Sequence, residues 1–300
     1  MKGTIIKGIA GFYYVRVEEE VYECKARGKF RNKKITPLIG DEVSISVDYD
    51  LQDTHYAYKQ GNIEAIFERR NKLIRPPVAN VDQGLVVFSV TYPQIHLDLL
   101  DRFLIMVEYE GIQPYIILNK VDAGDEATYA DIIEGYTKSG YEVIPVSAKS
   151  GSGLERIKAL LKDRTSFFAG PSGVGKSTLL NAIQPDLKLQ TGEVSEKIKR
   201  GKHTTRHVEL LPFNEGGYVL DTPGFTSLQF DALDEIAPEA LKTCYPEFEK
   251  YEGHCKFNGC SHIHEPGCAV KAALERDELF KSRYDNYVTY YRQLKEMRKW

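Results

Sequence analysis

The sequence predicts an α/β protein with a small β-barrel before its parallel sheet and a helical region after it. Three observations support this fold class. From Val81 to about residue 220, short apolar runs alternate with longer amphipathic stretches, which is typical of parallel strands joined by helices. The first 70 residues instead contain short alternating runs between turn residues. After Asp231 the pattern is helical and surrounds a cluster of cysteines and histidines.

Length and composition indicate a globular chain of two or three domains. The chain has 300 residues, is 42% hydrophobic and 28% charged, and carries a net charge of -3. It shows neither a charged-then-apolar leader nor an apolar run near the ~18 residues that a membrane span needs. We therefore expect a cytoplasmic protein with no membrane partner.

The N-terminal region predicts a small antiparallel barrel or sandwich, because turn residues separate the runs "GFYYVRV", "EEVYECKA" and "DEVSISVDY". Its segment Lys25–Lys34, "KARGKFRNKK", holds six basic residues and no acid. That segment either contacts phosphates or forms a solvated loop. The prolines of "RPP" at Arg75–Pro77 interrupt regular structure and mark a linker.

The central region predicts a mostly parallel sheet with helices on both faces. Its strands are expected in "QGLVVFSV", "QPYIILNK", "YEVIPVSA" and "TSFFAG", each followed by an amphipathic stretch. Two further strands, "HVELLPF" and "GYVLDTP", are expected to form a hairpin around "NEGG". In the last helix, Tyr284, Tyr287, Tyr291 and Leu294 recur at spacings of three and four, which predicts a buried face.

A phosphate-binding loop is predicted where "GPSGVGKS" follows an apolar strand and opens a helix. Its glycines let backbone amides turn toward phosphate oxygens, and the helix N-terminus adds positive potential. Lys176 should reach the β- and γ-phosphates, and Ser177 should coordinate Mg²⁺. The nucleotide contacts expected here are Gly170, Pro171, Ser172, Gly173, Val174, Gly175, Lys176, Ser177 and Thr178.

The run "YVLDTPG" predicts the metal-linked aspartate of a P-loop nucleotide hydrolase. Asp221 would bind Mg²⁺ directly or through water, and the amide of Gly224 would sense the γ-phosphate. By itself "DTPG" also fits a plain turn, so this interpretation depends on the phosphate loop.

Two further loops predict that the base is guanine. In "NKVD" the carboxylate of Asp122 can accept hydrogen bonds from guanine N1 and N2, a pattern that adenine cannot supply. In "SAK" the amide of Ala148 can meet guanine O6. The residues expected to form this base site are Asn119, Lys120, Val121, Asp122, Ser147, Ala148 and Lys149. The two matched loops favour GTP over ATP.

A structural zinc site is predicted from Cys255, Cys260, His262 and Cys268. Three thiolates and one imidazole complete a tetrahedral shell and leave no position for substrate. His254 and His264 are alternative ligands. An odd cysteine count without a secretion signal favours metal over a disulfide framework.

The order of these motifs resembles that of the circularly permuted GTPases, because "NKVD" and "SAK" precede "GPSGVGKS" and "DTPG". Over its whole length the chain is similar to the ribosome small-subunit-dependent GTPase (RsgA) family, whose zinc motif also contains "CxHxxEPxC". The resemblance implies an OB-fold-like RNA-binding domain at 1–70, a circularly permuted P-loop GTPase domain at 71–230 and a zinc-binding helical domain at 231–300.

The resemblance also bears on the hydrolytic step. Familiar small GTPases place a glutamine soon after D-x-x-G, whereas here Phe225 follows Gly224. The segment "RGKHTTRH" resembles the first switch of the family, so Thr204 or Thr205 should close on Mg²⁺ and the γ-phosphate. His203 is the candidate for positioning water, with a structural or RNA-contact role as the alternative. The expected catalytic set is therefore Lys176, His203, Thr204 and Thr205.

The resemblance implies hydrolysis of GTP to GDP and phosphate, stimulated by the small ribosomal subunit, in late maturation of that subunit. The barrel and the zinc domain would bind rRNA, with one structural Zn²⁺ and with Mg²⁺ accompanying GTP, and we expect a monomer. Because the chain leaves the GTPase domain just after "DTPGF", hydrolysis could move or release the zinc domain. The alternatives are a large-subunit assembly GTPase and a nucleotide-gated RNA-binding module with incidental hydrolysis.

Overall fold

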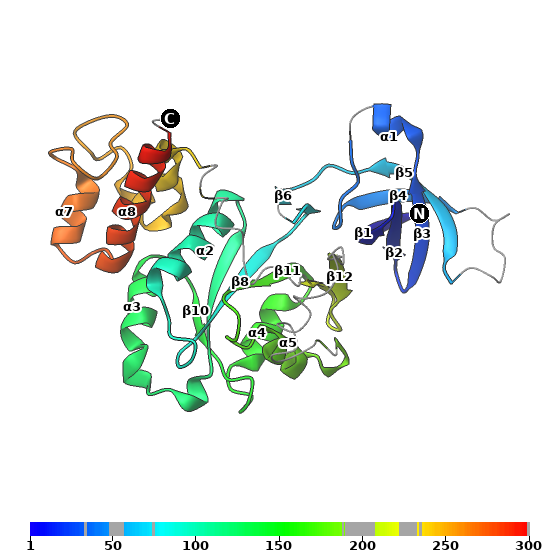
Figure 1. Cartoon of the computed structure of the whole chain (residues 1–300), viewed down its shortest axis with the longest axis horizontal. Coiled ribbons are helices and arrows are strands. Elements are labelled where there is room, and N and C mark those ends of the chain that lie inside the picture. Colours follow the sequence, from blue (N-terminus) through cyan, green and yellow to red (C-terminus); the bar gives the residue numbers. More distant parts are fainter. Residues whose placement is uncertain are drawn as a thin grey trace. The chain divides into compact units, whose positions relative to one another are not determined.

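A computed structural model describes residues 1–32, 35–47, 57–73, 76–187, 189, 208–221, 233, 236 and 237–298. The chain divides into two units, each made of three segments. Figure 1 colours the chain by residue number. The first unit contains Met1–Asp82, Leu161–Phe167 and Arg200–Gly224. The second contains Gln83–Leu160, Phe168–Lys199 and Phe225–Trp300.

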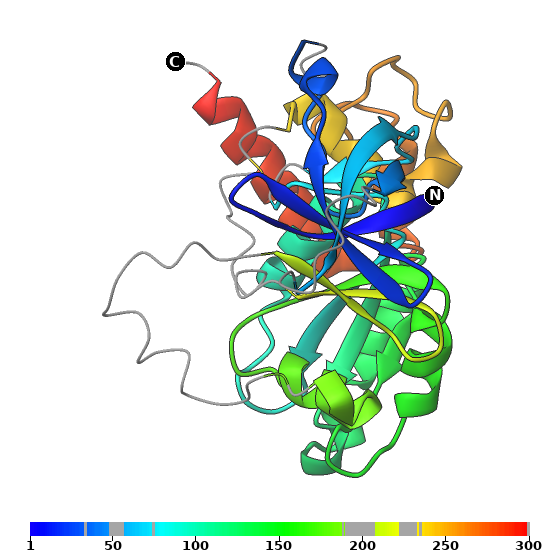
Figure 2. The same cartoon turned by 90° about the vertical axis from the view of Figure 1, so that its right-hand side faces the viewer.

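The first unit contains a five-stranded barrel, which confirms the predicted N-terminal β-domain. Its strands follow the order β1-β2-β3-β5-β4, and β4 pairs back with β1 to close the barrel. Figure 2 draws the ribbon of this N-terminal region in blue to cyan. Closure removes the exposed sheet edges. The strands are β1 (Lys2–Ile9), β2 (Phe12–Val17), β3 (Glu20–Ala26), β4 (Glu42–Val47) and β5 (Lys59–Ile66). A short helix, α1 (Gly28–Asn32), begins inside the basic segment.

Alternate side chains of the barrel strands point inward and form its core. The buried residues of this core are Ile5, Val15, Tyr22, Cys24, Phe30, Val43, Ile45 and Ile63. A buried carboxylate, Asp41, accepts a hydrogen bond from the Leu38 amide at 2.7 Å and a bidentate pair from Arg69 at 2.6 and 2.7 Å. The hydrogen bonds with Asp41 raise the pKa of Arg69. They attach the chain that leaves β5 to the barrel wall.

Beyond the barrel, the first unit contains the predicted hairpin. β12 (Glu209–Pro212) and β13 (Gly217–Asp221) pair antiparallel, and β11 (Arg164–Ala169) runs parallel to β13. β12 also pairs with β1 at Lys7 and Glu209, whose side chains form an ion pair at 2.8 Å. The strand that ends at Asp221, β13, thus belongs to the same sheet as the barrel strand β1, because β12 pairs with both. A short ladder of β6 (Lys72–Leu73) and β7 (Val78–Ala79) follows the barrel.

The second unit contains parallel strands and helices, as the alternating pattern predicted. The strands β8 (Gln83–Ser89), β9 (Gln113–Asn119) and β10 (Val143–Pro145) lie in the order β10-β9-β8. Every residue of β8 is buried, as expected of a strand covered on both faces. The helices are α2 (Leu97–Tyr109), α3 (Ala130–Lys138), α4 (Leu154–Leu161) and α5 (Lys176–Ile183). Short 3-10 turns occupy η2 (Val121–Ala123), η3 (Glu126–Thr128) and η4 (Pro185–Leu187).

The C-terminal part of the second unit is helical. It contains η8 (Pro238–Cys244), η9 (Pro246–Tyr251), α7 (Ala269–Glu275) and α8 (Lys281–Met297). The four residues predicted to form one face of the last helix are all buried, and Tyr287 packs edge-on against the rings of Tyr245 and Phe248. None of the helices in the described part of the chain combines the length and the apolar character needed to cross a membrane.

A buried arginine joins this helical region to the strands and helices before it. Arg283 of α8 is 1% exposed and donates to Asp101 of α2 at 2.8 Å, to Glu247 of η9 at 2.6 Å and to the Tyr141 hydroxyl at 3.1 Å. Its guanidinium carbon lies 4.6 Å from the centre of the Tyr245 ring. Removing one partner of a buried ion pair typically costs about 3–5 kcal/mol because the other charge is left uncompensated. We therefore regard Arg283 as essential to the packing of α8.

Glu108 of α2 lies in the same buried region. Burial raises its pKa from 4.5 to about 7, although a hydrogen bond with Tyr141 and the charge of Arg283 oppose that shift. The nearby carboxylates of Glu247 and Glu249 raise it further. In the folded protein the neutral form of Glu108 therefore predominates below about pH 7.

We predict that Glu108→Gln removes part of the pH dependence of stability. The folded pKa of Glu108 lies above its unfolded value, so its contribution is complete below about pH 4.5 and is lost as the pH rises through about 7. That contribution is on the order of 1–3 kcal/mol. Denaturant unfolding at pH 5 and at pH 8 should therefore show a smaller pH difference for Glu108→Gln than for the wild type.

Glu134→Gln, on the exposed face of α3, is the matched control and should leave the pH difference unchanged. Identical pH profiles for the wild type and Glu108→Gln would contradict the assignment.

Candidate nucleotide and metal sites

The predicted phosphate loop joins β11 to α5, and glycine is required at two of its turns. Gly170 has a φ of 135°, and a Cβ there would lie 2.1 Å from the carbonyl oxygen of Val87 in β8. Gly175 has a φ of 96°, and a Cβ there would lie 2.6 Å from the side-chain nitrogen of Asn119. The loop thus passes too close to its neighbours for any larger residue.

Lys176, the first residue of α5, folds back over the phosphate loop. Its Nζ donates to the carbonyl oxygens of Gly170 and Pro171, both at 2.7 Å. Burial lowers the pKa of Lys176 to about 8. An anionic phosphate in the loop would favour the charged form, so phosphate binding is expected to raise this pKa again.

The Asn119 side chain connects three loops. Asn119 is 1% exposed, and its Nδ2 donates to the Val174 carbonyl of the phosphate loop at 2.9 Å. Its Oδ1 accepts from the amide of Lys120 at 2.8 Å and from the amide of Ala148 in the "SAK" loop at 3.3 Å. The two predicted base loops and the phosphate loop therefore meet at one buried amide group.

Lys120 forms a second connection at the same place. It has a left-handed φ of 68°, and its Nζ donates to the carbonyl oxygens of Tyr92 at 2.6 Å and Gly173 at 2.8 Å. The Lys120 stem consequently lies along the surface between the base loop and the phosphate loop. Burial lowers the pKa of Lys120.

The carboxylate of Asp122 is held in one orientation at the surface. Its Oδ1 accepts from the buried Ser147 hydroxyl at 2.6 Å, and the exposed Lys149 ammonium lies 4.0 Å from Oδ2. The Asp122 carboxylate can therefore still accept hydrogen bonds from two donors on the edge of a base.

The structure thus brings together the residues predicted for the base loops and the phosphate loop. Asp221 lies at the end of β13, but its side chain is outside the described part of the chain. His203, Thr204 and Thr205 of the predicted catalytic set and the predicted γ-phosphate contact Gly224 are also outside the described residues, whereas Lys176 and Ser177 begin α5.

The sequence pattern gave no role to the loop between β8 and α2, which also lines this region. Two residues of this loop lie against glycines in or next to the predicted nucleotide loops. A Cβ added to Gly124 would lie 2.7 Å from a methyl group of Val90, and a Cβ added to Gly173 would lie 3.7 Å from the ring of Pro93. Tyr92 presents an 82% exposed side chain, while Lys120 binds its carbonyl. The sequence did contain one indication of a role for this loop: it follows the carboxyl end of a parallel strand, and ligand-binding loops commonly lie at that end of the sheet.

The structure gathers the four predicted zinc ligands into one cluster. The ligand atoms of Cys255, Cys260, His262 and Cys268 all lie within 4.8 Å of one another. His262 Nδ1 is 3.4 Å from the Cys268 sulfur and 3.6 Å from the Cys255 sulfur. Ligands about 2.3 Å from a shared zinc ion would be about 3.8 Å apart, so the cluster fits one tetrahedral Zn²⁺.

The surroundings of the cluster suit thiolates. The amides of His262, Ala269 and Lys271 point at cysteine sulfurs over 3.3–3.5 Å. Such donors stabilise the negative charge that thiolate ligands bring. The alternative ligands His254 and His264 are both exposed, and neither belongs to the metal-ligand group found among the described residues.

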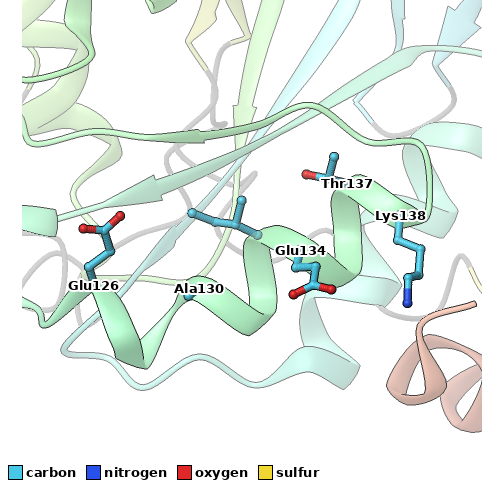
Figure 3. Close-up of a pocket in the computed structure, with 6 residues that line it drawn as sticks. Glu126, Ala130, Glu134, Thr137 and Lys138 are labelled. Atoms are coloured by element: carbon cyan, nitrogen blue, oxygen red, sulfur yellow. The ribbon is translucent and has the colours of Figure 1, made fainter. Parts of the chain in front are cut away.

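A pocket of about 470 Å³ lies away from these motifs (Figure 3). It is lined by Glu126, Ala130, Ile133, Glu134, Thr137 and Lys138, which follow η3 and one side of α3. Its lining contains none of the predicted nucleotide or zinc residues, so we do not assign the site there.

The comparison with known families decides the identity of the chain. Residues 66–231 match the model of the RsgA GTPase family, and residues 2–53 match that of the RsgA N-terminal domain. The chain belongs to the RsgA GTPase family. It is therefore a GTP-hydrolysing enzyme, and the family implies Mg²⁺ together with GTP.

Relatives of this family match the chain end to end. A protein of Alkaliphilus metalliredigens named "Small ribosomal subunit biogenesis GTPase RsgA" is 51% identical over 100% of this chain and 99% of its own length. A protein of Caldanaerobacter subterraneus with the same name is 46% identical over 100% of this chain and 97% of its own length.

Two solved structures share the fold. YjeQ from Thermotoga maritima is 37% identical with a TM-score of 0.83, and covers 98% of both chains. YloQ, described as a circularly permuted GTPase, is 43% identical with a TM-score of 0.80, and covers 99% of this chain and 95% of its own. The fold of this RsgA-family chain therefore agrees with that of both solved structures, and its motif order agrees with the description of YloQ as circularly permuted.

We predict that Asp122→Asn changes the base preference of the enzyme. An asparagine amide cannot accept from both N1 and N2 of guanine, but it can donate to the O2 of xanthine. The affinity for GTP should fall by about 100-fold or more, while that for xanthosine triphosphate should rise. Equilibrium titration with fluorescent nucleotides measures both.

Asp125→Asn is the matched control, because Asp125 lies three residues after Asp122 and its side chain caps η3 by accepting from the Ala127 amide. It should bind GTP as the wild type does. Unchanged GTP affinity in Asp122→Asn would reject Asp122 as the residue that recognises guanine.

We predict that His262→Ala lowers zinc content and that His264→Ala does not. The wild type should hold about one zinc ion per chain, and loss of one ligand opens the closed tetrahedral shell. Elemental analysis of purified protein measures the ratio, and a thermal melt measures the accompanying loss of stability. Equal zinc loss in both variants would show that the ligand set is assigned wrongly.

Proposed function

We propose that this enzyme hydrolyses GTP on the small ribosomal subunit during late maturation of that subunit. The observation that carries the proposal is full-length similarity, near 50% identity, to proteins named as small ribosomal subunit biogenesis GTPases. The nucleotide geometry is compatible with it, since the base loops and the phosphate loop meet at Asn119. The site of action would be the cytoplasm, and the chain would act as a monomer.

The barrel is the proposed contact with rRNA. Lys25, Arg27 and Lys29 are all exposed where β3 passes into α1. One carboxylate, Glu64, pairs with both Arg27 at 2.6 Å and Lys29 at 3.8 Å. The three basic side chains therefore outnumber this carboxylate, and the surface keeps a positive charge. The Lys25 ammonium lies 5.2 Å from the centre of the Phe12 ring. Cations interleaved with an aromatic ring suit phosphates and unstacked bases.

In the proposed mechanism, the backbone of Gly170–Thr178 binds the phosphates and Asp122 orients guanine. Lys176 would leave its two carbonyl partners and donate to the β- and γ-phosphates. Ser177 and Asp221 would hold the Mg²⁺ that accompanies GTP, and that ion would neutralise the charge that develops at the phosphates.

Water would be positioned by His203, and Thr204 or Thr205 would close on the γ-phosphate side. Because Phe225 occupies the place of the usual glutamine, basal turnover should be slow. Binding to the subunit would then order this machinery and accelerate the reaction.

We predict that isolated small subunits stimulate GTP turnover and that large subunits do not. Phosphate release should rise by about 10-fold or more with small subunits, because partner-supplied positioning of water and charge is worth that much or more. Release is measured with small subunits, with large subunits and with neither. In the same assay, His203→Ala should lose the stimulated rate while retaining nucleotide affinity.

Each outcome selects a function. Stimulation by large subunits would assign the enzyme to that subunit instead. Absence of stimulation by either would favour a nucleotide-gated RNA-binding module with incidental hydrolysis. Full stimulated turnover in His203→Ala would remove His203 from the catalytic set.

A further inference from the structure

One helix, α8, contacts the two helices that follow the nucleotide loops. Arg283, Asn286 and Tyr290 recur at spacings of three and four, so they share one side of α8. Arg283 and Asn286 donate to the two carboxylate oxygens of Asp101 at 2.8 and 2.6 Å, and the Tyr290 hydroxyl donates to the Asp98 carbonyl at 2.6 Å. α8 is thus bonded to the first turns of α2.

The same attachment includes α3. The Tyr136 hydroxyl of α3 donates to Asp101 at 2.9 Å. A Cβ on Gly135 would lie 2.6 Å from the ring of Phe280, the residue that caps α8, so only glycine allows this contact. Lys138 donates to the Asp277 carbonyl at 2.7 Å. α8 and the turn before it therefore hold α2 and α3 together.

Both helices begin a few residues after a loop of the nucleotide site. α2 starts at Leu97, shortly after Tyr92, whose carbonyl accepts from Lys120. α3 starts at Ala130, shortly after the "NKVD" loop that contains Asn119 and Asp122. A displacement of either helix would change the position of the loop that precedes it.

The adjacent side of α8 contacts the zinc loop. The hydroxyls of Tyr284 and Tyr287 donate to the carbonyls of His262 and Ser261, both at 2.7 Å. Both tyrosines are buried. One rigid helix therefore connects a metal-ligand residue to the supports of the base loops.

We propose that α8 couples zinc binding to guanine-nucleotide binding, with Arg283 as the positioning residue of that coupling. Bound zinc fixes the loop that contains Ser261 and His262, and this loop positions α8. The helix α8 in turn fixes α2 and α3 in the arrangement that orients Lys120 and Asp122. Thermodynamic linkage makes the effect reciprocal, so bound nucleotide must strengthen zinc retention by the same factor. The proposal rests on the nucleotide and zinc sites assigned above.

The coupling acts on the loops that contact the base, so its effect on nucleotide affinity does not depend on the γ-phosphate. GDP and GTP should be affected by the same factor. This distinguishes it from coupling through the chain that follows "DTPG", which would act on GTP and leave GDP unchanged.

The test compares nucleotide affinities of zinc-loaded full-length variants by titration with fluorescent GDP and a non-hydrolysable fluorescent GTP analogue. Arg283→Lys keeps the charge but loses the forked contact with Glu247 and Asp101. It should weaken both nucleotides by about fivefold or more, and by the same factor. Tyr290→Phe removes the hydrogen bond to the Asp98 carbonyl and little volume, and should weaken the binding of both nucleotides by about threefold.

Asp285→Ala is the matched control, because Asp285 lies on the exposed side of α8 and pairs with Lys281. It should bind both nucleotides as the wild type does. Circular dichroism and thermal melts establish that each variant is folded, and Tyr290→Phe provides the measurement if Arg283→Lys unfolds.

The reciprocal measurement follows zinc transfer to a chromogenic chelator with and without saturating GDP. At equilibrium, GDP should lower the amount of zinc that the wild type gives up to the chelator, and the difference should shrink in Tyr290→Phe. Unchanged affinities in folded variants, loss of GTP binding alone, or zinc release insensitive to GDP would each overturn the proposal. A wild type that binds no guanine nucleotide would instead overturn the assigned site itself.

Discussion

The nucleotide site depends on the buried side chain of Asn119. A primary amide provides donors and an acceptor at once, and here it donates to the phosphate loop and accepts from both base loops. A carboxylate at this position would place an acceptor against the Val174 carbonyl, and a longer amide would not fit the same spacing. The relative positions of the loops therefore follow from contacts between groups and are independent of chain order.

That independence accounts for the reversed order of the motifs. Asn119 and Val174 are 55 residues apart, and Asn119 comes first in the chain, yet their hydrogen bond is 2.9 Å long. A site built from loops at one end of a sheet survives a change in where the chain begins, provided that the loops still meet. The consequence of permutation is a change in what is attached to the site.

The zinc-binding region is attached through the buried charge of Arg283. Burial acts to lower the pKa of Arg283, but Glu247, Tyr141 and Asp101 together raise it well above its ordinary value, so the guanidinium stays charged inside the core. A buried charge of this kind needs all of its partners in place at once. It therefore specifies one arrangement of α2, η9 and α8 where apolar packing alone would tolerate several.

The sequence by itself determined the fold class, the phosphate and base loops and the composition of the zinc cluster, because strand periodicity, loop glycines and ligand spacing are local properties. It named His262 as the fourth zinc ligand, which the structure confirms, but it assigned no role to Tyr92, Glu108 or Arg283. Their roles were decided by the tertiary structure: Arg283 meets Asp101 across 182 residues, and burial is the largest cause of the raised pKa of Glu108. Local patterns predict elements and motifs, whereas the pairing of distant buried charges depends on how the elements pack.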